Sequence, residues 1–123
     1  MLAADTSAWI DYSKGKESLA AKRLESALSD GTLVMPLPVI FEILSGPGLT
    51  ETAARAIQQI PQLDILSGFW HRAANTRRAL LQKGLKARAM DCLIAQCCMD
   101  HDVSLIAADV DYRHFQKLGL ALG

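Results

Sequence analysis

Four acidic residues stand where a folded chain could bring carboxylates together. Asp5 and Asp109 each follow a short apolar run, and Glu42 and Asp91 each lie among apolar neighbours in a helical pattern. Carboxylates beside apolar surface cost free energy unless something pairs them. If the four converge, mutual repulsion raises their pKa values, and a divalent cation that prefers oxygen ligands relieves it. The pattern therefore predicts a site for Mg2+ or Mn2+, which suit carboxylates, water and substrate phosphate.

Such a site could cleave a phosphodiester. Two ions about 4 Å apart can activate a water molecule and stabilise the leaving oxygen. Thr6 and Ser7 directly follow Asp5, and their hydroxyls could orient a metal-bound water. Asp111, two residues beyond Asp109, is an auxiliary acid.

Each acid also has a purely structural interpretation. Asp5 alone is better explained as the N-cap of a helix. Asp91 can stabilise a helix N-terminus electrostatically, and Asp109 and Asp111 can be turn and cap residues. Glu42 is the hardest to explain in this way because it lies mid-helix among core residues. The four acids taken together favour the metal site.

The elements that must position these acids alternate between strands and helices. Apolar runs predict strands over residues 1–4, 32–35, 63–66 and 103–108, with 120–122 as a candidate edge strand. Periodic apolar residues predict helices over 6–12, 17–28, a proline-opened stretch from 36 to 44, 50–59, 67–84, 89–101 and 111–118. This alternation indicates an α/β protein with a mostly parallel sheet. In such sheets ligands bind at the carboxyl ends of the strands, where Asp5 and Asp109 stand.

Length and composition set limits on the kind of protein. The 123 residues, half of them hydrophobic, suit one domain with a real core. The longest apolar run, residues 33–41, is shorter than the roughly 20 residues that span a bilayer. The N-terminus lacks the basic region of a signal peptide, so a cytoplasmic protein is expected. Cys92, Cys97 and Cys98 lack zinc-site spacing and are expected to be small buried hydrophobes.

The charges are unevenly distributed although the net charge is zero. Residues 65–90 contain six bases and no acid, and residues 91–111 contain five acids and no Lys or Arg. A basic surface beside an acidic pocket suits a polyanion, and a solvated helix face is the equally weighted alternative. The candidates for holding RNA phosphates are Arg72, Arg77, Arg78 and Arg88, of which Arg88 could instead pair with Asp91.

Four ordered motifs resemble those of PIN domains, with VapC-type toxins of bacterial toxin–antitoxin pairs as the nearest match. They are Asp5-Thr6-Ser7 after a short strand, Glu42 in a proline-opened helix, Asp91-Cys92-Leu93-Ile94-Ala95, and the segment from Leu105 through Asp109 to Tyr112. The resemblance covers essentially the whole chain. It implies one PIN-like domain over residues 1–123, with a central mostly parallel β-sheet flanked by helices in an α/β/α arrangement.

The resemblance also implies an activity and partners. The expected protein is an endoribonuclease dependent on Mg2+ or Mn2+, with Asp5, Glu42, Asp91 and Asp109 as the catalytic metal-binding acids and Asp111 as a possible auxiliary. The expected partners are the RNA substrate, a second copy in a homodimer, and a cognate antitoxin that wraps the protein and blocks its site. No membrane association is expected.

Two positions depart from the family pattern. Ala107 stands where the family often has Thr or Ser, so a hydroxyl is missing near the last acid and the second metal position is in question. Tyr112 stands where the family commonly has Phe, which is a mild change.

Two non-enzymatic alternatives remain open. A phosphoacceptor receiver domain needs an early acidic pair, a mid-chain strand ending in Asp and a late strand ending in Lys, and this chain shows none of these. A PIN scaffold that only binds protein or RNA is conceivable because of Ala107, although the presence of all four acids argues against it.

Overall fold

Short parallel strands form the centre of the computed structural model, which describes residues 1–123. Strand β1 (Leu2–Ala4) pairs with β4 (Ser104–Ile106), and β2 (Met35–Pro36) pairs with β3 (Gln62–Leu63), both in parallel. Isolated parallel bridges join Leu2 to Leu33 and Leu105 to Leu122. The strand segments therefore run in the order β3, β2, β1, β4 and C-terminal segment. The expected parallel α/β arrangement is confirmed.

The strands are shorter than the sequence predicts. The apolar run over 103–108 pairs only over Ser104–Ile106, because its partner β1 ends at Ala4 and Asp5 begins a helix. The run expected over 63–66 contributes Gln62–Leu63, and the edge strand expected over 120–122 is a single bridge at Leu122. Apolar runs thus located the strands but overestimated their paired lengths.

Six α-helices and one 3-10 helix surround the strands. They are α1 (Thr6–Ser13), α2 (Leu19–Asp30), α3 (Leu37–Leu44), α4 (Glu51–Gln58), α5 (Phe69–Gln82), α6 (Ala89–Asp100) and the 3-10 helix η1 (Val110–Leu118). The helix predicted from residue 17 begins at Leu19 because Ser18 is its N-cap, accepting a hydrogen bond from the Ala21 amide at 3.0 Å. The stretch 111–118 is helical as expected, but of the 3-10 kind.

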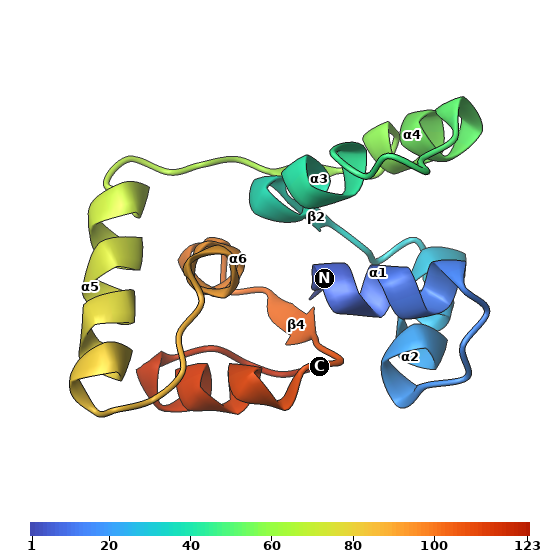
Figure 1. Ribbon diagram of the computed structural model, residues 1–123. Helices are drawn as coiled ribbons and strands as arrows, with labels where there is room; N and C mark the ends of the chain where they lie inside the picture. The colour runs from blue at the N-terminus through green and yellow to red at the C-terminus, as the bar shows by residue number, and fades with distance from the viewer.

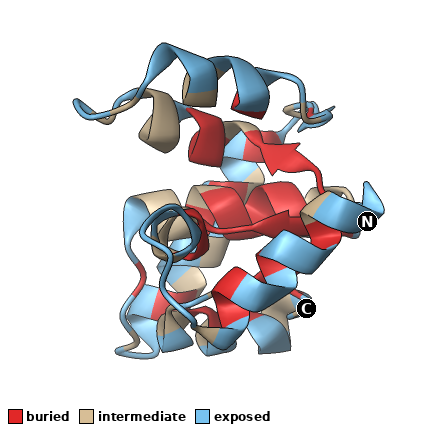
Figure 2. Cartoon of the chain, turned by 90° about the vertical axis from the view of Figure 1, so that its right-hand side faces the viewer, coloured by how far each residue is buried: buried red, intermediate tan, exposed pale blue.

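Helix α6 is the most buried of the helices and lies near the middle of the molecule, beside β4 (Figure 1). Helix α5 packs along one side of α6, the α1–α2 pair lies on the other side, and α3 and α4 lie above (Figure 1). Figure 2 shows buried segments running through this central region, with exposed residues around it. Asp91 therefore lies on the element that most other parts of the chain pack against.

The three cysteines are buried and unpaired, as expected. All lie on α6, and burial raises the pKa of the Cys92 and Cys97 thiols to about 11. They pack as small apolar groups in the core. None of the helices has the length and apolar character needed to cross a membrane.

Candidate metal and active site

Asp5 lies at the carboxyl end of β1 and is 2% exposed. It caps α1 by accepting the Ala8 amide at 2.9 Å, so the structural interpretation is confirmed. Its Oδ2 accepts the Ser7 hydroxyl at 2.6 Å, and its Oδ1, which accepts the Ala8 amide, also contacts the Ala108 amide after β4 at 3.5 Å. Capping fixes the Asp5 carboxylate between the ends of two neighbouring parallel strands, so the cap does not exclude a role in a site.

Glu42 lies on α3 and is partly buried. Its Oε1 accepts a hydrogen bond from the Thr6 hydroxyl at 2.5 Å, across 36 residues of sequence. Thr6 and Ser7, the two hydroxyl residues after Asp5, therefore orient two different acids. This bond ties α3 to the start of α1 and turns Glu42 toward the Asp5 end of the sheet.

Asp91 lies in the first turn of α6 and is half-buried. Its Oδ1 accepts the hydroxyl of Tyr112 at 3.2 Å. Tyr112 is 2% exposed and belongs to η1, so this contact connects two elements. Tyr112 stands where the family commonly has Phe, and its hydroxyl supplies a donor to an acid, so this departure is more than a mild change.

Asp109 follows β4 and caps η1, with its Oδ1 accepting the Asp111 amide at 2.9 Å. Asp111 forms an ion pair with Lys86 at 3.5 Å. The turn and cap interpretation of this pair is thus confirmed. Asp109 still faces Asp91 closely enough for its charge to affect that carboxyl.

The acids act on one another electrostatically, with Asp91 at their centre. Burial raises the pKa of Asp91, and the negative charges of Asp109 and Glu42 raise it further, against the Tyr112 hydrogen bond and the charge of Arg88. Burial likewise raises the pKa of Asp5, with a smaller contribution from Asp91. These mutual effects place Asp5, Glu42, Asp91 and Asp109 in one region of the fold.

The side chains do not converge on a single point. No group of three His, Cys, Asp or Glu residues is arranged so that it could hold one ion in common. Each of the four carboxylates is instead turned toward a protein donor: Ser7 and Ala8, Thr6, Tyr112, or the Asp111 amide. Like charges in a partly buried site favour such separation. The donor set consists of oxygen atoms alone, which fits Mg2+ or Mn2+ and does not fit a soft metal.

The candidate RNA-binding arginines differ in how many hydrogen bonds and ion pairs their side chains already make within the protein. Arg72 donates two hydrogen bonds to Asp100, at 2.9 and 2.6 Å, and a third to the Ser67 carbonyl at 2.8 Å. Asp100 in turn accepts the Gln96 amide at 2.9 Å. Arg72 is thus engaged in joining α5 to α6, so its expected role as a free phosphate ligand is corrected.

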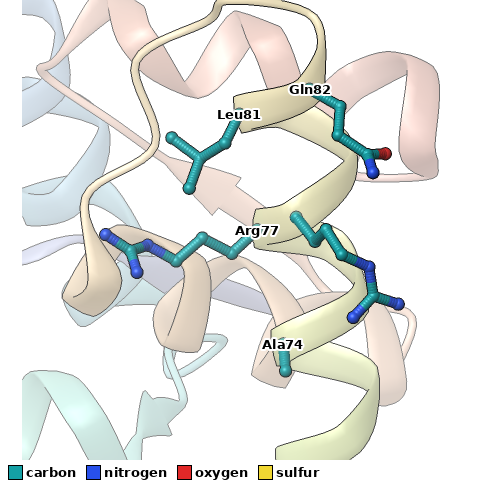
Figure 3. Close-up of a pocket in the computed structure, with 5 residues that line it drawn as sticks. Ala74, Arg77, Leu81 and Gln82 are labelled. Carbon is teal, nitrogen blue, oxygen red and sulfur yellow. The ribbon is translucent and has the colours of Figure 1, made fainter.

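Arg77 and Arg78 line an open depression of about 450 Å3 along α5, together with Ala74, Leu81 and Gln82. Figure 3 shows Arg77 extending from α5 toward the segment that leads into α6, where its Nε donates to the Ala87 carbonyl at 3.0 Å. Arg78 contacts only Asn75 on its own helix, at 2.6 Å. Arg88 forms no ion pair with Asp91 within 4.0 Å. None of the four acids lines this depression.

Comparisons with known proteins agree with this geometry. The PIN domain family model matches residues 3–118. Ribonuclease VapC11 of Mycobacterium tuberculosis is 32% identical over 119 residues, covering 91% of this chain and 89% of the relative, and the VapC ribonuclease Mb1587 of Mycobacterium bovis matches equally.

Solved structures show the same fold. VapBC2 from Rickettsia felis, bound to a DNA fragment from its promoter, has a TM-score of 0.72 at 18% identity, covering 99% of this chain and 96% of that one. DNA-bound VapBC from Salmonella typhimurium has a TM-score of 0.71 at 16% identity, with the same coverage. The sequence match spans nearly the whole chain and the fold agrees with it, so this chain belongs to the PIN-domain family and, within it, to the VapC ribonucleases.

Proposed function

We propose that this protein is a metal-dependent endoribonuclease that acts as the toxin of a toxin–antitoxin pair. The observation that carries the proposal is the position of Asp91, whose carboxyl is affected by the charges of Asp109 and Glu42 and itself acts on Asp5. Four acids from separate elements lie near the carboxyl ends of β1 and β4, where α/β proteins bind ligands. The relatives that match by sequence are ribonucleases.

In this proposal Asp5, Glu42, Asp91 and Asp109 hold Mg2+ or Mn2+. The bound ion supplies activation of a water molecule and stabilisation of the leaving oxygen of the phosphodiester. Ser7 and Thr6 keep Asp5 and Glu42 oriented through their hydrogen bonds of 2.6 and 2.5 Å. Asp111 is auxiliary through its amide, which donates to Asp109, while its carboxylate pairs with Lys86.

The substrate in this proposal is RNA, guided by cationic side chains. Arg77, Arg78 and Arg88 remain as candidates for phosphate contacts, because none of them forms an ion pair. Arg72 is left out because Asp100 neutralises its charge. Phosphate contacts of this kind add affinity and do not select a sequence.

The proposed partners are a second copy of the chain and an antitoxin protein, with both proteins in the cytoplasm. The VapBC complexes of the same fold support a protein partner. An apolar depression of about 350 Å3 between α3, α5 and α6 also supports one, since Phe41 and Trp70 on its rim are 64% and 63% exposed.

An RNA cleavage assay tests the activity. Wild-type protein should cleave RNA in the presence of Mg2+ or Mn2+, and cleavage should stop when EDTA is added. Asp5→Asn and Asp91→Asn should lose cleavage while circular dichroism shows an intact fold. Asp30→Asn, at an exposed acid that ends α2, is the control and should keep full activity. Full activity in both site variants would refute the assignment.

A further inference from the structure

A polar groove begins at Asp109 and leads away from the candidate metal site. Two depressions of about 160 and 320 Å3 share Arg23, Ala107, Ala108 and Gly123 in their linings, so they form one continuous groove. The turn after β4 contributes to the lining of both depressions and lies between the α1–α2 pair and η1 (Figure 1). This groove is distinct from the depression along α5, and no residue is common to the two.

Three cations line the groove, and two of them have no Asp or Glu partner. Arg113, on η1, is exposed and makes no hydrogen bond or ion pair. Arg23, on α2, donates one Nη to the main-chain oxygen of Gly123 at 2.7 Å and pairs with no Asp or Glu side chain. Lys16 is paired with Asp11 at 3.9 Å. Two arginines from different elements therefore line the same groove without an acidic side chain paired to either.

The groove wall is continuous with the acids. Ala107 and Ala108 have no side chain beyond Cβ, so nothing there obstructs a polymer backbone. The Ala108 amide contacts the Asp5 carboxylate at 3.5 Å, and Asp109 lines the groove itself. At position 107, where the family often has a hydroxyl, the groove is therefore lined by a methyl group.

We propose that Arg23 and Arg113 bind backbone phosphates of the RNA strand beside the linkage that is cut. The inference rests on the proposed nuclease function and extends the same site. Arginine forks match phosphate oxygens in pairs, and such contacts are insensitive to base sequence. The groove therefore contributes affinity for the strand and sets its direction past the metal site, leaving the choice of sequence to other contacts.

The salt dependence of RNA binding tests this. A short fluorescent single-stranded RNA is titrated with protein in EDTA, so that no cleavage occurs, over a series of salt concentrations. Each phosphate contact on a single strand contributes about 0.7 to the slope of log K against log salt. Arg113→Gln should reduce the slope by about 0.7 and the Arg23→Gln, Arg113→Gln double variant by about 1.4. Arg113→Lys keeps the charge and should keep the slope.

Arg55→Gln is the matched control, because Arg55 on α4 is exposed and paired with Glu51 at 2.8 Å. Its slope should equal that of the wild type. Wild-type RNA cleavage and calorimetric Mn2+ binding by Arg113→Gln are measured in parallel. If the wild type cleaves RNA and both arginine variants keep the full slope, the groove assignment fails and the nuclease stands. If the arginine variants bind the antitoxin more weakly while the salt slope of RNA binding is unchanged, the arginines contact the protein partner instead of RNA. This outcome would also overturn the groove assignment. A wild type that cleaves no RNA contradicts the nuclease itself.

Discussion

At the scale of single residues, the Tyr112 hydroxyl is a hydrogen-bond donor in the acidic region that the Phe common in the family could not supply. It donates to Asp91 at 3.2 Å from a fully enclosed position. Burial and the nearby charges of Asp5 and Asp91 raise the pKa of Tyr112, so the hydroxyl keeps its proton and remains a donor. With one Asp91 oxygen engaged in this way, the other is free to bind an ion.

Tyr112→Phe should weaken Mn2+ binding by about tenfold, because groups that orient metal ligands typically contribute 10- to 100-fold in affinity. Isothermal titration calorimetry measures this directly, without an activity assay. Tyr12→Phe is the matched control, since Tyr12 is the other tyrosine and its hydroxyl contacts no acid. Equal affinity in wild type and Tyr112→Phe would show that the hydroxyl does not orient the ligand.

Asp91 should also make the metal-free protein sensitive to pH. Its pKa is raised above the ordinary 3.8, so the folded state holds a proton in a window where the unfolded state has lost it. Stability therefore falls as the pH rises through that window, and the penalty persists at higher pH. In EDTA, the thermal midpoint of Asp91→Asn should match or exceed that of the wild type at neutral pH and depend less on pH. A midpoint well below wild type would contradict this account of the acids.

At the scale of elements, local signals predicted more than long-range ones. The place of β1, the proline-opened helix α3 and the run before Asp109 followed from apolar pattern and caps, and the structure has all three. The ends of β4 could not be predicted from the apolar pattern, because pairing stops where its three-residue partner β1 stops. The Tyr112–Asp91 and Arg72–Asp100 contacts span 21 and 28 residues. They exist only once η1 and α5 have docked on α6, so no sequence window contains them.

The α5–α6 contact carries a buried polar network whose role is structural. Thr76 donates to Gln96 at 2.6 Å, Gln96 donates to Asp100, and Arg72 pairs with Asp100 through two bonds. Arg72→Gln leaves the Asp100 carboxylate, 7% exposed, without its cation. This variant should lower the thermal midpoint clearly, whereas Arg78→Gln should leave it nearly unchanged. Differential scanning fluorimetry measures both thermal midpoints. Equal midpoints for the two variants would contradict a structural role for Arg72 and leave it available as a phosphate ligand.

At the scale of the whole molecule, one apolar face is exposed to solvent. We propose that a second copy of the chain binds this face. Leu37, Phe41, Ile65, Trp70 and Leu93 contribute to this face, which gathers α3, α5 and α6. It is lined almost entirely by apolar side chains, and none of the four acids is among them.

Trp70→Asp should convert the dimer to a monomer, because it places a charge in apolar surface that association would remove from water. Light scattering after size-exclusion chromatography gives the mass of each species. Leu19→Asp is a matched control, since Leu19 is 64% exposed against 63% for Trp70 but lies on α2, away from the apolar face. The control should keep the wild-type mass. A wild type that is monomeric throughout, or a Trp70→Asp variant that remains dimeric, would remove this face as the site of self-association and leave it to the antitoxin.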